Sequence, residues 1–155
     1  MKNLRKIAVL MVALVMAFAM TACGGKEQSV SYQLVQESDG LVVTDNITLD
    51  AKGDVVQKMT EKIVVDTTAF DATQKEAINA VYDEMVAMYQ AVDGVECTGT
   101  AAENSYTIDI VIDATGSAVE ELAAQGLLQM EGTGNGISLK ASQAGFEASG
   151  YTIVE

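Results

Sequence analysis

The chain has 155 residues, the length of one ordinary domain, and its 22 Asp and Glu residues outnumber its nine Lys and Arg residues. It has no basic stripe that could displace counterions from phosphates, so we expect no nucleic-acid partner. Residues 23–155 contain no His and no Arg. This excludes Ser/His and Cys/His catalytic pairs, His-bearing zinc sites and bidentate arginine clamps there, and it leaves carboxylate and lysine chemistry open.

The first 22 residues have the pattern of a signal peptide. Lys2, Arg5 and Lys6 give a positive start, residues 7–20 are uncharged and apolar, and Thr21-Ala22 supplies small side chains. The apolar run is shorter than the roughly 20 residues that cross a bilayer. No later run approaches its length, so we expect no other membrane-spanning segment.

The junction after this run, Met20-Thr21-Ala22-Cys23, resembles a bacterial lipobox, with Met in place of the more usual Leu. The resemblance implies cleavage between Ala22 and Cys23 and a diacylglyceryl thioether on Cys23. Acyl chains such as palmitate then anchor the mature chain in the lipid bilayer, on the extracytoplasmic face of the cell membrane. The alternative is an ordinary secretory signal followed by a coincidental cysteine.

The expected organisation is a lipoprotein signal peptide (1–22), a lipidated tether (23–30) and one domain (31–155). Cleavage removes three of the nine basic residues and none of the 22 acidic ones, so the mature side chains carry a net charge of 6 − 22 = −16. The mature chain has 133 residues (155 − 22), and a chain of this length can bury enough apolar surface to fold without disulfides or metals.

The first half of the mature chain predicts three strands and a long helix. In the second strand Leu41, Val43, Ile47 and Leu49 share one face. The expected strands cover residues 29–37, 41–49 and 55–66. Asp71 and Gln74 form a capping box for a helix that ends at Asp93-Gly94. Apolar residues recur along it at helical spacing, namely Ile78, Val81, Tyr82, Met85, Met88, Tyr89 and Val92.

The second half predicts a hairpin, two short helices and a final strand. The hairpin covers 95–101 and 106–113, with isoleucines on one face. Ser117 and Glu120 form a second capping box for a helix to about residue 128, and a loop follows at 129–136. Ser138 caps a last helix that closes near Gly150. Residues 151–154 then return to the sheet as a strand.

These elements predict one α+β domain, with an antiparallel sheet of about six strands covered on one face by one long and two short helices. The order of the expected strands and helices along the chain is similar to that of the YehR-like lipoproteins, a bacterial family of unknown function. The resemblance covers nearly the whole chain, in ACGGKE (22–27), SYQL (31–34), GDVVQKMTEK (53–62), GVECTG (94–99), YTIDIVID (106–113) and SLKASQAGFE (138–147). It implies a membrane-anchored α+β domain and supplies no catalytic residues.

Two further features have simple interpretations. Cys97 alternates with Val95 on an expected strand and lacks a base to activate it, so we interpret it as a core thiol rather than a reactive or dimer-forming one. The glycine-rich stretch at 132–136 follows a helix and precedes no Lys-Ser/Thr pair, so it is interpreted as a linker and not as a phosphate loop.

The carboxylates and the helix stripe leave alternatives open. Asp109 and Asp113 share a strand face, and Asp45, Asp50 and Asp54 gather around the first hairpins. Such oxygens suit Ca²⁺, but no EF-hand spacing is present, so solvated faces and turns are the simpler interpretation. The stripe of Met and Tyr residues on the long helix (Tyr82, Met85, Met88 and Tyr89) could line a ligand groove, although core packing is the simpler interpretation there also.

We therefore expect a membrane-anchored binding or scaffolding module without catalytic residues, cofactor or metal. Its partner would be an envelope protein, a peptide or a small molecule. The alternative is a carboxylate- or cation-dependent enzyme acting on an envelope substrate, in which acidic groups converge in one cleft with perturbed pKa values. A third idea is a surface protein that sequesters cations.

Overall fold

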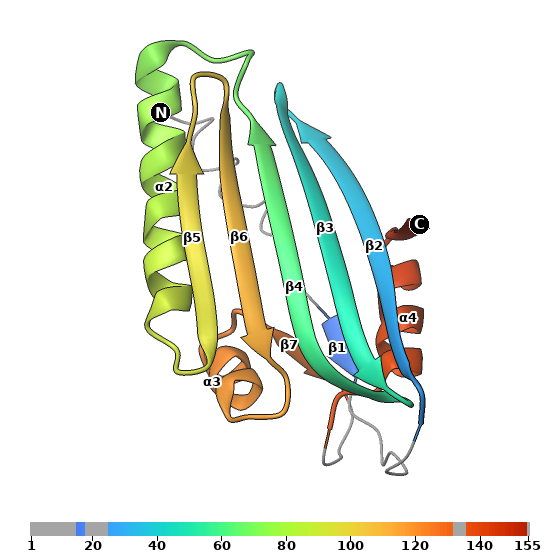
Figure 1. The fold of residues 1–155 in the computed structure, drawn as a ribbon. Helices are drawn as coiled ribbons and strands as arrows, with labels where there is room; N and C mark the ends of the chain where they lie inside the picture. Colours follow the sequence, from blue (N-terminus) through green and yellow to red (C-terminus); the bar gives the residue numbers. More distant parts are fainter. Residues whose placement is uncertain (1–14, 18–24, 132–135, 155) are drawn as a thin grey trace.

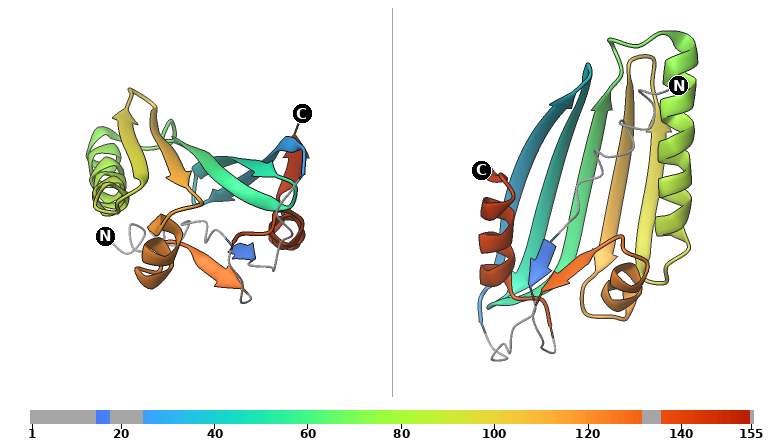
Figure 2. Two further views of the ribbon diagram at one scale, coloured as in Figure 1. Left: turned by 60° about the horizontal axis from the view of Figure 1, so that its bottom comes forward. Right: turned by 180° about the vertical axis from the view of Figure 1, so that it is seen from behind.

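The computed structural model describes residues 15–17, 25–131 and 136–154. Its centre is a six-stranded antiparallel sheet with strand order β5-β6-β4-β3-β2-β8 (Figure 1). Three helices, α2, α3 and α4, lie on one face of this sheet (Figure 2). The expected fold class is thereby confirmed. No helix in the described ranges is both long enough and apolar enough to cross a membrane.

The three predicted strands form a meander: β2 (Glu27–Ser38), β3 (Leu41–Lys52) and β4 (Val55–Asp66). Asp39 and Gly40 make the first turn with φ values of 52° and 85°, a conformation that Asp tolerates and Gly adopts freely. The register of β3 against β4 shifts between Asp50 and Ala51, so a bulge lets Ala51 and Val56 both face the core.

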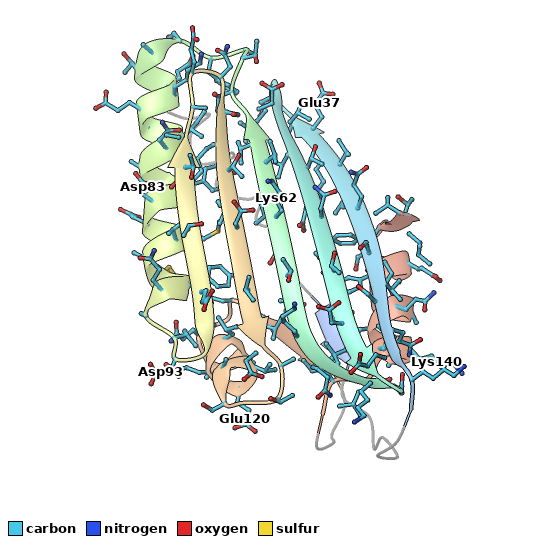
Figure 3. The ribbon with its side chains drawn as sticks, viewed as in Figure 1. Glu37, Lys62, Asp83, Asp93, Glu120 and Lys140 are labelled. Atoms are coloured by element: carbon cyan, nitrogen blue, oxygen red, sulfur yellow. The ribbon has the colours of Figure 1, made fainter. Side chains whose placement is uncertain are left out.

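The hairpin of β5 (Val95–Ala101) and β6 (Ser105–Asp113) extends the sheet beyond β4. Alternate residues of the strands face the helices, and we call this side the inner face. Its fully buried side chains include Tyr32, Leu41, Ile47, Leu49, Val65, Ile108 and Ile110. The outer face carries mostly polar side chains, and Figure 3 shows Lys62 on it at the middle of β4.

Helix α2 (Ala72–Gln90) packs beside β5 and begins with the predicted capping box. The Gln74 amide donates to Asp71 Oδ1 over 2.9 Å, and the Asp71 amide donates to Gln74 Oε1 over 3.0 Å. One residue of the predicted stripe is wrong, because Met88 is 44% exposed and Val86 is buried instead. Val81 is partly buried, and the other five residues of the stripe are buried in the core, which favours the packing interpretation over a ligand groove.

Helix α3 (Ala118–Ala124) is shorter than expected, and its predicted capping box is wrong. Ser117 has helical φ and ψ values of −78° and −10°, and its hydroxyl makes no capping hydrogen bond. A side-chain cap needs an extended residue at this position. Glu120 and Glu121 still place negative charge in the first turn, where the helix dipole favours it. Gly126, with φ of 73°, lets the chain leave the helix early.

A short strand, β7 (Gln129–Glu131), follows where a loop was expected. It pairs in parallel with β1 (Val15–Ala17), so the two form a separate two-stranded sheet. The prediction that residues 129–136 form a loop is therefore wrong at 129–131, and residues 132–135 lie outside the described ranges. The pairing joins segments more than a hundred residues apart, and no local pattern reports it.

Helix α4 (Leu139–Ala148) begins at the predicted cap, where Ser138 Oγ accepts from the Ala141 amide over 3.1 Å. Asp54 reinforces this end, since it accepts from the Ser138 hydroxyl over 2.7 Å and from the Lys140 amide over 2.8 Å. The last strand, β8 (Thr152–Val154), returns to the sheet as predicted, and it pairs there with β2.

Substituting Gly99→Ala is expected to lower the free energy of unfolding by about 1–3 kcal/mol, because this glycine lets an aromatic ring pack against the β5 backbone. A Cβ there would overlap the Tyr106 hydroxyl and lie 3.0 Å from Val86 Cγ2. The Tyr106 hydroxyl donates to Asp83, and its ring stacks on Tyr82 with centroids 5.7 Å apart, so the ring cannot simply swing away.

The matched control is Gly116→Ala, whose Cβ would come no closer than 3.9 Å to Asp113 Oδ2. Denaturant unfolding of both variants is the measurement. Equal stabilities for the two would contradict this account of Gly99.

Candidate functional site

The predicted lipidation site falls in a stretch, residues 18–24, that the structure does not describe. Ala22 and Cys23 lie outside the described residues, so cleavage and lipidation stay predictions. Cys97 faces the core at 5% exposure, as interpreted from its strand position. Burial, with Glu61 and Asp109 nearby, raises the pKa of its thiol from 9.0 to about 11. A thiol with a raised pKa is a poor nucleophile at neutral pH.

Four of the five predicted acidic residues make separate surface contacts. Asp50 pairs with Lys58 at 2.9 Å, and Asp109 lies 3.7 Å from Lys62 on the outer face. Asp113 accepts from the Thr115 amide and hydroxyl, and Asp54 caps α4. They do not form a shared site. Among the described residues, no group of three or more His, Cys, Asp or Glu could hold a metal ion.

The fifth predicted residue, Asp45, points into the core and meets Glu61 there. Asp45 pairs across the sheet with Ile63, and Glu61 pairs with Ile47, so the two acids are diagonal neighbours on the inner face of β3 and β4. Asp45 is 0% exposed and Glu61 is 2% exposed. Tyr151, which precedes β8, donates its hydroxyl to Asp45 Oδ2 over 2.5 Å. We call these three residues the inner acid cluster.

Burial dominates the electrostatics of the inner acid cluster. It raises the pKa of Glu61 well above 4.5, and the neighbouring Asp45 charge raises that pKa further. Burial also raises the pKa of Asp45, from 3.8 to about 6, against the opposing effects of the hydrogen bonds from Tyr151 and Glu61. Both shifts act in the direction that favours one proton held between the two acids.

Some hydrogen-bonding capacity near the inner acid cluster is unused. Apart from the mutual contact of the two acids, Asp45 Oδ1 and Glu61 Oε2 have no donor among the described groups, and the buried Tyr32 hydroxyl has no partner there either. Buried polar atoms without partners cost free energy. The cluster is therefore a polar centre that costs folding free energy inside an apolar face.

Sequence reasoning missed Glu61 and Tyr151. The signal was present, because Glu61 alternates with Met59, Ile63 and Val65, and Asp45 fills the gap between Val43 and Ile47. Two acids at inward positions on adjacent strands indicate a buried pair of carboxyl groups. Tyr151 carried no such signal, since its contact depends on where α4 returns the chain to the sheet.

The described surface also has two open hollows at one end of the sheet. One holds about 610 Å³ and the other about 500 Å³, and Gln57 lines both. Most of the residues that line them are charged or polar, namely Glu27, Gln28, Ser29, Asp50, Lys52, Gln57, Lys58, Glu96 and Asp113. Both hollows are open to solvent, which distinguishes them from the enclosed pockets that bind small molecules.

Comparison with known proteins gives relatives along the whole chain. A family model described as "Protein of unknown function (DUF1307)" matches residues 28–152. The uncharacterized lipoprotein YehR of Escherichia coli strain K12 is 28% identical over 163 residues, covering 100% of both chains. The uncharacterized lipoprotein Lin0239 of Listeria innocua is 26% identical over 156 residues, covering 100% of this chain and 99% of the relative.

Two solved structures resemble the fold. An NMR structure of the E. coli YehR protein aligns with a TM-score of 0.57 at 22% identity, covering 84% of this chain and 93% of that chain. An NMR structure of a protein from Streptococcus pneumoniae TIGR4 aligns with a TM-score of 0.50 at 13% identity, covering 88% and 90% of the two chains. These likenesses concern the fold alone.

Proposed function

This chain belongs to the DUF1307 family of proteins of unknown function, and from that premise we propose that it is a lipid-anchored binding or scaffolding module at the cell envelope. The lipoprotein names of its relatives support the anchor. In this proposal residues 1–22 are cleaved, Cys23 carries the acyl chains, residues 23–30 form a tether, and the domain from residue 31 faces away from the cytoplasm.

The binding role is supported by the shape and the lining of the two hollows at the end of the sheet. They are open and lie side by side, and both polar and charged side chains line them. A surface of mixed charge, with Lys52 and Lys58 among acids, suits a polypeptide partner better than a small apolar molecule. The proposed partner is therefore another envelope protein or peptide.

A photocrosslinking amino acid at Gln57 tests the binding role, because this residue lines both hollows. The processed protein in intact cells is expected to give a discrete higher-mass adduct. The matched control is the same substitution at Glu37, an exposed residue at the opposite end of the sheet (Figure 3). Adducts of equal yield at both positions, or none at Gln57, would count against a binding surface here.

The anchor is tested with the two cysteines of the chain. Cys23→Ser is expected to abolish both incorporation of an alkyne-labelled fatty acid and cleavage before residue 23, because the thiol is the acylated atom. Cys97→Ala, which alters the only other cysteine, is expected to keep both. Labelling followed by mass spectrometry of the N-terminus is the measurement. A labelled Cys23→Ser protein would disprove the lipobox assignment.

The second candidate function is a carboxylate-dependent enzyme, and the inner acid cluster is the observation that favours it. Two acids converge there with raised pKa values, as acid–base catalysis requires. Both are buried, so a substrate could reach them only if the inner face opened. Incubation with envelope extracts tests this role, since turnover that survives Glu61→Gln would dismiss it.

A further inference from the structure

The feature that carries a further inference is the strand pair outside the main sheet. Strand β1 pairs in parallel with β7 in the register Val15↔Gln129, Met16↔Met130 and Ala17↔Glu131. On its other side β1 lies against α4. Figure 2 shows β7, β1 and α4 on the inner side of the sheet, with β1 between the other two. An extended segment thus lies between a strand and a helix.

Residues 15–17 precede the cleavage site proposed between Ala22 and Cys23, so processing removes β1. In the described part of the chain β1 is the one strand paired with β7. Its loss leaves the amides and carbonyls of that β7 edge without their strand partner. Such an edge is a template for another extended chain.

We propose that β7 of the processed protein accepts an extended polypeptide segment of a partner, in the place that Val15–Ala17 holds in the precursor. This inference rests on the proposed function, since it needs both cleavage and a binding role. Backbone hydrogen bonds to β7 supply part of the affinity, and packing against α4 supplies the rest, as in other cases of strand addition.

The precursor indicates the chemistry of the partner segment. The strand that fills the site, Val15-Met16-Ala17, is uncharged and apolar, and it runs parallel to β7. The mature side chains carry a net charge of 6 − 22 = −16. This charge favours a partner whose apolar segment has basic rather than acidic flanks, because opposite charges steer association.

The probe is a synthetic peptide, Lys-Lys-Ala-Leu-Val-Met-Ala-Phe-Lys-Lys, which carries residues 13–18 of this chain between basic ends. Binding is measured by fluorescence anisotropy to the processed protein held in neutral phosphatidylcholine nanodiscs. Saturable binding above that to empty nanodiscs is expected. Binding to the Cys23→Ser chain, which keeps its own strand in place, should be at least about tenfold weaker because the tethered segment competes.

Two proline peptides test whether the backbone is recognised. Adjacent amides of a strand point to opposite sides, so only one of the amides of Val15 and Met16 faces β7. Proline at one of these positions should therefore weaken binding at least about tenfold, and proline at the other should weaken it less. Proline peptides that both bind like the parent, or equal binding to processed and unprocessed protein, would overturn the proposal.

Disulfide trapping tests the register. A peptide with Cys in place of Met16 should crosslink to Met130→Cys in a Cys97→Ala background, because these positions are paired. It should crosslink less to Glu131→Cys, because Glu131 is paired with position 17 and not with position 16. Equal trapping at both positions would contradict strand addition. If these tests fail while the Gln57 adduct forms, the binding module stands and only this inference falls.

Discussion

Raising the pH from about 4 to about 8 is expected to lower the free energy of unfolding of the processed protein by roughly 3 kcal/mol or more. The cause is the inner acid cluster. Burial raises the pKa of Asp45 from 3.8 to about 6 and that of Glu61 well above 4.5. Between the unfolded and folded pKa values the folded chain binds more protons than the unfolded chain, so stability falls as the pH rises.

The magnitude follows from Asp45 alone, because the change from 3.8 to about 6 corresponds to roughly 3 kcal/mol. Glu61 acts in the same direction and extends the loss to higher pH. Acids whose pKa is lowered, such as Asp50 and Asp113, act in the opposite direction. Their contribution is lost only as the pH falls below about 4, outside this window.

The control is the double variant Asp45→Asn/Glu61→Gln. The high acidity of the chain also makes it less stable as carboxylates ionise, and this effect remains in the variant. Denaturant unfolding at several pH values, in wild type and variant, isolates the buried pair. If the double variant loses as much stability between about pH 4 and about pH 8 as wild type does, the cluster is not the cause.

Tyr151→Phe is expected to destabilise the protein by about 1.5–3 kcal/mol at neutral pH, since it removes a hydrogen bond to a buried charged group. The Tyr151 hydroxyl donates to Asp45 Oδ2, which lies in a fully buried side chain. The same bond lowers the pKa of Asp45, so its loss raises that pKa further. The destabilisation should therefore be smaller at about pH 4, where Asp45 is already neutral in both proteins.

Tyr32→Phe is the matched control. Tyr32 is also fully buried on the inner face, but its hydroxyl has no partner among the described groups. Removing an unpaired buried hydroxyl is expected to be neutral or slightly stabilising. Thermal unfolding of both variants at two pH values gives the comparison. A larger loss for Tyr32→Phe than for Tyr151→Phe would contradict the assigned hydrogen bonding.

Local sequence signals predicted most of the sheet and two of the three helix starts. The strand limits 55–66 and 95–101 match β4 and β5, because alternation and turn residues act over a few positions. The Asp71 and Ser138 caps also match. Ser117 fails as a side-chain cap because its backbone is helical rather than extended, and residue type alone does not report that.

The candidate site was less predictable. Five acids were chosen from the sequence, and only Asp45 belongs to the inner acid cluster. Asp50, Asp54, Asp109 and Asp113 instead make surface ion pairs, turn contacts or a helix cap. Inward position on adjacent strands could have identified Glu61, but the contact of Tyr151 with Asp45 spans 106 positions and needs the completed fold.

The sequence by itself determined the class of fold, the family resemblance and the expected anchor at Cys23, because periodicity, caps and the lipobox pattern are all local. The tertiary structure alone decided which acids meet, which hydroxyl reaches them and which strand lies beside β7. The physical reason is that strand register, and the return of the chain to the sheet after α4, bring distant residues within hydrogen-bonding reach. Burial then changes the pKa values of those residues.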